Sequence, residues 1–147
     1  MRFEKTVTVK APIQRAWDVL LDPVAIGACV PGVERIEPID ATRFVVSVNV
    51  KVGIVRARFK VNVTVTETRP PYYLKSDGVG DEAGLTSSLR QTTEMELKEV
   101  GTNETEIRVR KDTDVFGVLG TFGYTVIKGK AERMWEEFAA NLKTRIE

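Results

Sequence analysis

A long run in the middle of the chain alternates strictly between apolar and polar side chains. From Val55 to Thr66, every second position is Val, Ala or Phe, and the positions between them are Arg, Lys, Asn or Thr. Successive side chains of a β-strand point to opposite faces, so this run predicts a strand with one dry face and one wet face. A sheet with one dry face needs a second layer to cover it. The chain must therefore fold as a sheet plus a cover.

Similar alternating runs flank this strand. They predict further strands over residues 6–10, 33–39, 44–52, 72–79, 85–97 and 104–114. Short segments rich in Gly, Pro, Asp and Asn separate them, which is typical of hairpin turns. The predicted turns cover residues 40–42, 53, 69–71, 80–84 and 100–103. The pattern indicates an antiparallel meander.

Three segments follow helical spacing instead. Pro12 opens a helix over 13–21 that Asp22-Pro23 ends, and a short helical piece over 24–28 leads to the turn at Pro31-Gly32. The last segment has one apolar stripe at i, i+3, i+4 spacing, formed by Ile127, Ala131, Met134, Trp135, Phe138, Leu142 and Ile146. We expect this helix to cover the dry face, since it is the longest predicted helix.

The predicted fold is therefore α+β, with a curved antiparallel sheet wrapped around a long C-terminal helix and two short helices after the first strand. This arrangement is called a helix-grip. A chain of 147 residues fits one domain, and we expect a single domain over residues 1–147.

Composition excludes several kinds of chemistry. The chain has no histidine, which removes the commonest general base and metal ligand, and one cysteine, Cys29, so neither an internal disulfide nor a zinc cluster can form. The net charge of +1 gives no basic surface for nucleic acid. We find no catalytic constellation and no phosphate-binding loop, and we expect neither a cofactor nor a metal.

The first five residues lack the apolar core of a signal peptide, which favours a cytoplasmic location. Abundant Val, Glu, Lys and Arg with few Gln give a weak indication of a thermophilic source.

Between Asp114 and Lys128 the chain carries no charge, although 29% of its residues are charged. This stretch is too short to span a membrane, which takes roughly 17–25 apolar residues. Gly117, Gly120 and Gly123 recur in it at every third position. Two interpretations stay open: the segment lines the mouth of an apolar cavity, or it is a plain strand-to-helix loop packed on the core.

The glycine-containing turns indicate where a cavity would open. Because hairpin strands reverse direction, Pro31-Gly32, Gly53, residues 80–84 and residues 117–123 fall at one end of the predicted sheet. Ligand sites are concave and mostly apolar, with a few polar groups. The predicted ligand-binding residues near this end and along the dry face are Val30, Pro31, Gly53, Phe59, Leu89, Gln91, Lys111, Phe116, Leu119, Phe122 and Val126.

Two of these residues, Gln91 and Lys111, are polar positions on the predicted dry face. Each has a simpler explanation: Lys111 can reach water near the end of its strand, and Gln91 can bond to a neighbouring backbone group.

Several motifs together resemble one family. They are Val9-Lys10-Ala11-Pro12, Ala16-Trp17-Asp18-Val19-Leu20, Asp22-Pro23, Cys29-Val30-Pro31-Gly32, Val50-Lys51-Val52-Gly53 and Asp114-Val115-Phe116-Gly117-Val118-Leu119-Gly120. Spread over nearly the whole chain, they resemble the carbon monoxide dehydrogenase-associated CoxG family within the START-like (SRPBCC) superfamily.

The resemblance implies a helix-grip fold around an apolar cavity, without catalytic residues. It also implies an association with molybdenum-containing carbon monoxide dehydrogenase, in which the family is thought to recruit the enzyme to the membrane and to handle a lipid-like partner such as a quinone. Many relatives carry a C-terminal extension thought to attach them to the membrane, whereas this chain ends at Ile146-Glu147. We therefore expect any contact with the inner face of the membrane to be peripheral.

These observations favour a non-enzymatic accessory protein that holds an apolar small molecule, lipid or quinone-like, and that assists a molybdenum hydroxylase-type dehydrogenase. One alternative is an enzyme of the cyclase or hydrolase kind, with Lys111, Tyr73 or Tyr124 as acid or base. Another is a docking module that binds a protein through Phe116, Leu119 and Phe122. The oligomeric state is not indicated.

Overall fold

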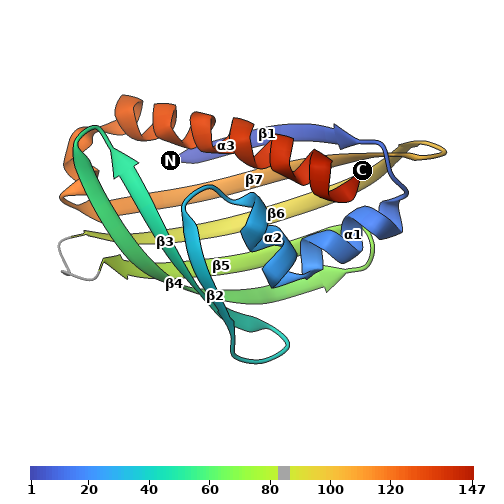
Figure 1. Cartoon of the computed structure of the whole chain (residues 1–147), viewed down its shortest axis with the longest axis horizontal. Helices are drawn as coiled ribbons and strands as arrows, with labels where there is room; N and C mark the ends of the chain where they lie inside the picture. The colour runs from blue at the N-terminus through green and yellow to red at the C-terminus, as the bar shows by residue number, and fades with distance from the viewer. Residues whose placement is uncertain (83–86) are drawn as a thin grey trace.

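Seven antiparallel strands form one sheet in the order β1-β7-β6-β5-β4-β3-β2 (Figure 1). The computed structural model describes residues 1–82 and 87–147. The elements are β1 (Arg2–Val9), α1 (Ile13–Leu21), α2 (Pro23–Cys29), β2 (Val33–Pro38), β3 (Arg43–Val52), β4 (Val55–Arg69), β5 (Tyr73–Glu82), β6 (Ser87–Gly101), β7 (Glu104–Gly117), the 3-10 turn η1 (Leu119–Phe122) and α3 (Tyr124–Ile146).

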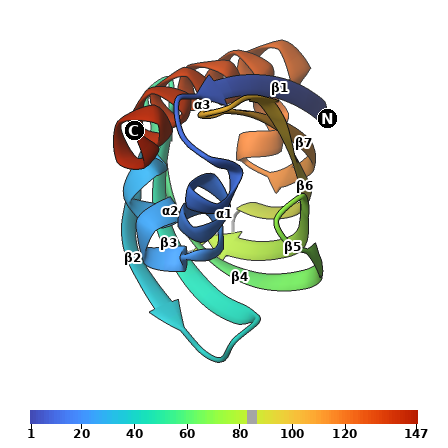
Figure 2. The same ribbon diagram turned by 90° about the vertical axis from the view of Figure 1, so that its right-hand side faces the viewer.

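The sheet curls around its helices. The view in Figure 2 has α1 inside the curve and α3 closing it beside β1. Helix α3 also approaches β3, close to the opposite edge of the sheet. The predicted α+β helix-grip with two short helices after the first strand is confirmed.

Helices α1 and α2 fill one end of the curve. Ile13, Ala16, Trp17 and Leu20 of α1 are buried. Asp22 then caps α2, because its Oδ1 accepts hydrogen bonds from the backbone N–H groups of Val24 (3.0 Å) and Ala25 (3.4 Å). Together the two helices plug the end of the concave face that lies opposite the glycine-containing turns.

One predicted turn is wrong. Residues 80–82 continue β5, where Gly80 pairs with Val61 on one side and Leu89 on the other. A Cβ at Gly80 would lie 2.9 Å from Val61 Cγ2, so this position in the strand needs a glycine for close packing rather than for a turn. The remainder of that predicted turn, Ala83 and Gly84, and the predicted strand start at Leu85 lie outside the described residues.

Other element boundaries differ by a few residues. Strand β1 begins at Arg2 rather than residue 6, and β7 continues to Gly117, three residues past the predicted end. The charge-free segment therefore contains the end of β7, η1 and the first turn of α3. Its prediction as the join between the last strand and the last helix is confirmed.

The apolar interior forms two separate clusters. The helix-side cluster includes Val9, Trp17, Leu74, Ile107, Val109, Leu142 and Ile146. The hairpin-side cluster consists of Val52, Ala57, Phe59, Val61 and Leu119, with half-buried Leu89, Val115 and Phe122 packed against it. A small domain usually has one contiguous core. The division of this one directs attention to the surface between the clusters.

Candidate functional site

A band of polar side chains crosses the concave face between the two clusters. In the register of the sheet, Ser76 of β5 is opposite Thr93 of β6, and Thr93 is opposite Lys111 of β7; in the next row, Gln91 is opposite Thr113. Buried Leu74, Leu97, Ile107 and Val109 alternate with the outward positions of these strands, which places the band on the concave face. We call Ser76, Gln91, Thr93, Lys111 and Thr113 the polar band.

Apolar rows border the band on both sides. Leu74, Met95 and Val109 form the row that belongs to the helix-side cluster, and Leu89 and Val115 form the row that belongs to the hairpin-side cluster. The polar band therefore separates two dry surfaces. An amphiphilic molecule lying along the concave face would meet both kinds of surface.

Lys111 is the charged member of the polar band. Burial lowers the pKa of its ammonium, although the side chain remains half-buried rather than fully enclosed. A group that is both desolvated and still accessible lies in a recess, not on the outer surface. Within the described residues, Lys111 Nζ has no hydrogen bond and no ion pair.

The cover above the concave face is unevenly packed. Near the C-terminal end of α3, Leu142 and Ile146 are 0% and 2% exposed. The apolar stripe before them is only half-buried, at Ile127, Ala131, Met134, Trp135 and Phe138. Trp135 contacts Phe3 of β1 edge-on at 6.1 Å between ring centroids, and it contacts Phe138 at 5.6 Å. The N-terminal part of α3 therefore covers the sheet without filling the space beneath it.

The structure brings six of the predicted ligand residues onto the concave face. Phe59, Leu89, Leu119 and Phe122 belong to the hairpin-side cluster, and Gln91 and Lys111 belong to the polar band. These are the positions that strand alternation had indicated.

The other five lie around this region. Val30 and Pro31 are half-buried in the α2–β2 turn, and Gly53 is at the tip of the β3–β4 hairpin with φ 60°. Phe116 pairs with Ser88 and lies on the convex face, 51% exposed, and Val126 is 43% exposed in the first turn of α3. These two do not join the concave cluster.

The 3-10 turn η1 closes the hairpin-side cluster. Ser87 Oγ accepts a hydrogen bond of 3.1 Å from the backbone N–H of Leu119, which ties η1 to the start of β6. Gly120 fits only without a side chain, since a Cβ there would lie 2.6 Å from the carbonyl oxygen of Val115. The predicted role of the small residues in this segment is thus partly one of close packing.

Several large apolar side chains are exposed at this end of the molecule, on the β3–β4 tip, the end of β7, the turn before η1 and the start of α3. They are Ile54 (98% exposed), Phe116, Val118, Tyr124 and Val126. Figure 1 has these segments together at the left. We call them the apolar end.

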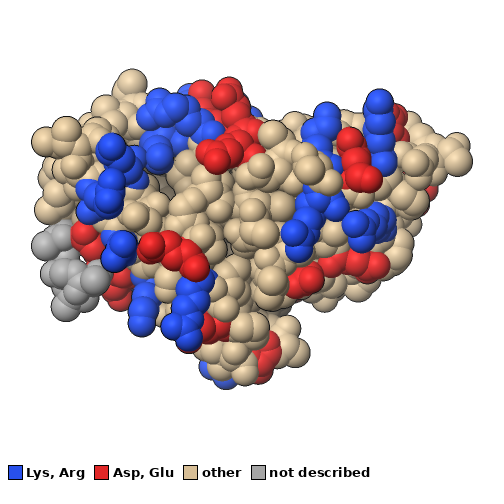
Figure 3. All heavy atoms as spheres, viewed as in Figure 1, with Lys and Arg blue, Asp and Glu red and all other residues tan. Residues whose placement is uncertain are grey.

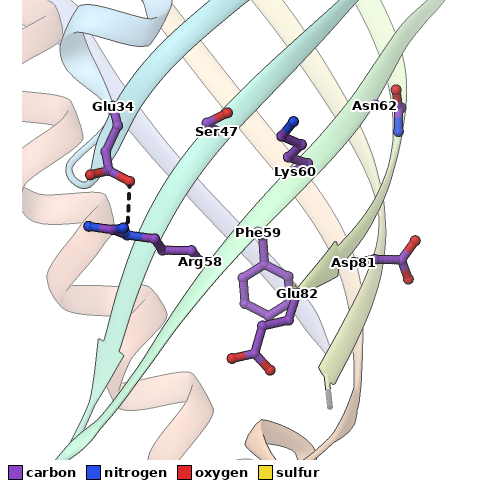
Figure 4. A pocket seen from close by; sticks show the side chains of 8 residues that line it. All are labelled: Glu34, Ser47, Arg58, Phe59, Lys60, Asn62, Asp81 and Glu82. Carbon is purple, nitrogen blue, oxygen red and sulfur yellow. Dashed lines mark ion pairs between the residues drawn. The ribbon is translucent and has the colours of Figure 1, made fainter. Parts of the chain in front are cut away.

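A groove of about 620 Å³ follows the outer side of β4. Figure 4 has side chains of β2, β3, β4 and β5 around it, with an ion pair of 3.5 Å between Arg58 Nε and Glu34 Oε1. Lys60 and Asp81 add one further charge of each sign, and Phe59 is the predicted ligand residue that contacts it. The mixed charge matches the rest of the face in Figure 3, where acidic and basic residues are interspersed.

Sequence reasoning missed Ser76 and the groove. Alternation from Leu74 would have placed Ser76 on the dry face. The groove had no comparable signal, because its residues come from four strands and look like ordinary surface positions. In residues 1–82 and 87–147, no group of three or more His, Cys, Asp or Glu could hold a metal ion.

Comparison with known proteins decides the family. The model of the carbon monoxide dehydrogenase family CoxG matches residues 6–147, nearly the whole chain. The chain belongs to the CoxG family. None of the curated proteins matches it in sequence.

Solved structures share the fold of this CoxG family member at low sequence identity. A conserved protein from Geobacillus kaustophilus has a TM-score of 0.91 at 18% identity, over 99% of this chain and 95% of that one. A START superfamily protein from Mycobacterium smegmatis has a TM-score of 0.73 at 16% identity, over 99% and 96%. The ZhuI aromatase/cyclase from Streptomyces sp. R1128 has a TM-score of 0.65 at 17% identity, over 99% and 90%.

These results confirm the START-like fold, and family membership indicates an accessory, ligand-binding role. The aromatase/cyclase keeps enzymatic use of the same fold in view. Of the three predicted acid–base candidates, Lys111 lies on the concave face. Tyr73 lies on the convex face, where its hydroxyl donates a hydrogen bond of 2.9 Å to Glu94 Oε2, and Tyr124 is 59% exposed. Across the described part of the chain, no helix is both long and apolar enough to cross a membrane.

Proposed function

We propose that this CoxG family member is a non-enzymatic accessory protein that holds an apolar small molecule, of the lipid or quinone kind, between the concave face of its sheet and α3. The observation that carries the proposal is the half-buried apolar surface beneath the N-terminal part of α3, facing Leu89, Val115 and Phe122. Removing such surface from water supplies ~25 cal/mol per Å² to ligand binding. Gln91 or Lys111 would orient a polar head.

The apolar end supports a way in for the ligand. Exposed apolar residues gathered at one place mark interaction sites. We propose that Ile54, Phe116 and Val126 contact the inner face of the membrane peripherally, next to η1, so that a lipid passes between membrane and cavity without crossing much water.

The family name supports the partner. We propose that the ligand is exchanged with a molybdenum-containing enzyme of the carbon monoxide dehydrogenase type. Binding of a protein through Phe116, Leu119 and Phe122 without any ligand is the competing proposal.

Native mass spectrometry tests the carrier proposal. Protein purified without detergent and incubated with a total lipid extract is expected to carry a lipid-sized adduct that collisional activation removes. Leu89→Trp fills the concave face and should abolish the adduct. Val79→Trp is the matched control, because Val79 is half exposed on the convex face of the neighbouring strand, and it should keep the adduct.

A bare wild-type protein that acquires no adduct would sink the carrier proposal. If that bare protein still captured a purified dehydrogenase of the proposed type, and Phe122→Asp abolished the capture, the docking module would replace it. Melting curves of each variant establish that the tryptophan substitutions leave the protein folded.

A further inference from the structure

The strongest unexplained feature of the concave face is the charge of Lys111. Its side chain projects from the middle of β7 between Thr93 of β6 and Phe3 of β1 in the register of the sheet. Phe3 in turn contacts Trp135 of α3. The ammonium is therefore held among aromatic and hydroxyl groups instead of among acids.

The carboxylates around this position have other partners or lie out of reach. Asp112 and Asp114 point to the opposite face, where each lies 3.8 Å from the N-terminal ammonium. Glu132 of α3 pairs with Lys5 at 3.8 Å. Glu82 is six positions along β5 from Ser76, roughly 20 Å at the rise of a strand.

The hydrogen-bonding groups beside Lys111 are also unoccupied. In residues 1–82 and 87–147, the hydroxyls of Ser76, Thr93 and Thr113 and the amide of Gln91 make no side-chain hydrogen bond. Residues 83–86, which the structure does not describe, contain no acidic side chain. The polar band thus presents a cation and several donors without a protein acceptor.

From this geometry we infer that the head group of the natural ligand is anionic, a carboxylate of the fatty-acid type, and that it binds at Lys111 within the polar band. The inference rests on the proposed carrier function. An ionised carboxylate is an acceptor with about four lone-pair sites, which matches the donors of Lys111, Thr93 and Gln91. A neutral carbonyl would accept one of these bonds and leave the desolvated charge uncompensated, which is costly.

The tail has one apolar route from the band that is not already packed. Helices α1 and α2 and the C-terminal turns of α3 fill the helix-side cluster, whereas Leu89, Val115 and Phe122 toward the apolar end remain half-buried. The acyl chain therefore runs from Lys111 past Leu89 toward η1.

Matched ligands test the head group. Isothermal titration with palmitate, palmitate methyl ester and a menaquinone compares an anion, its neutral isostere and a neutral quinone. Wild-type protein should bind palmitate at least about tenfold more tightly than the ester, equivalent to about 1.4 kcal/mol. Lys111→Met should remove this preference while ester binding is retained, and Lys111→Arg should keep it. Lys98→Met on the exposed face of β6 is the control.

Two results would overturn the inference in distinguishable ways. Equal binding of all three ligands, unchanged in Lys111→Met, removes the anionic head group and leaves the carrier intact. Binding of none of them, together with a bare native mass spectrum, removes the carrier function and the head group together. Thermal melts of both Lys111 variants establish that a lost preference is not lost folding.

Discussion

At the scale of single residues, local hydrogen bonds set the detail of the turns. Asp40 in the β2–β3 turn accepts hydrogen bonds from the backbone N–H groups of Thr42 (3.0 Å) and Arg43 (2.9 Å) through Oδ1. Its Oδ2 accepts from the Arg43 guanidinium at 2.8 Å. These bonds to Arg43 and Thr42 lower the pKa of Asp40 from 3.8 to about 2.

The depressed pKa gives a prediction with a definite sign. Because the folded value lies below the unfolded one, the stabilisation is present above the unfolded pKa of 3.8 and is lost as the pH falls toward 2. Asp40→Asn should therefore lower the free energy of unfolding at neutral pH, and the difference from wild type should shrink to nothing by about pH 2. Urea denaturation at several pH values measures this. A difference that stays constant across the range would contradict it.

Single residues also mark the limit of what alternation predicts. The inward positions of β6 and β7, among them Gln91, Thr93 and Lys111, followed from the sequence because neighbouring Leu97, Ile107 and Val109 fixed the phase. Phe116 did not, since its apolar side chain suggests the dry face while the register assigns it to the convex one. Whether an apolar residue near a strand end is buried depends on what covers it, which alternation does not reveal.

At the scale of elements, helix α3 has two different halves. Leu142 lies in the helix-side cluster with 0% exposure, whereas Met134, two turns earlier, is half-buried. The C-terminal half therefore anchors the helix and the N-terminal half covers the concave face. Asn141 adds to the anchor, since its Nδ2 donates a hydrogen bond of 3.0 Å to the carbonyl oxygen of Cys29 at the end of α2.

This difference predicts unequal costs for truncation. Leu142→Ala should lower the free energy of unfolding by about 2–5 kcal/mol, as is typical for a buried leucine in a well-packed site. Met134→Ala on the same helix is the control and should cost clearly less, because it removes fewer contacts. Urea denaturation of both variants measures the two losses. Equal losses would mean that the two halves of α3 are packed alike.

The element order was predictable, and several boundaries were not. Hydrophobic period and turn residues indicated each strand and helix in order. The Gly80-Asp81-Glu82 stretch reads as a turn, yet it is strand, because packing of Val61 and Leu89 over Gly80 is a tertiary effect. The convex groove was likewise hidden, since it depends on which strands become neighbours.

At the scale of the whole molecule, the two apolar clusters behave as separate packing units. Ile107 lies in the helix-side cluster and Leu119 in the hairpin-side cluster, with the polar band between them. Substitutions at sites without shared contacts usually add in their effects on stability.

The separation predicts additivity. Ile107→Val should cost about 0.5–1.5 kcal/mol and Leu119→Ala about 2–5 kcal/mol. The double variant should lose their sum to within about 0.5 kcal/mol. Chemical denaturation of the ligand-free protein measures all three. A coupling energy well above that margin would show that the clusters form one core.

The half-anchored cover has a consequence for how occupancy can be observed. A guest beneath α3 completes the interior that the protein itself leaves unfinished, so the empty and loaded forms differ more in resistance to heat than in outline. By mass action, loading at a hundredfold excess over Kd adds about 2.7 kcal/mol to the folded state. A shift in melting temperature thus becomes a practical meter of cargo.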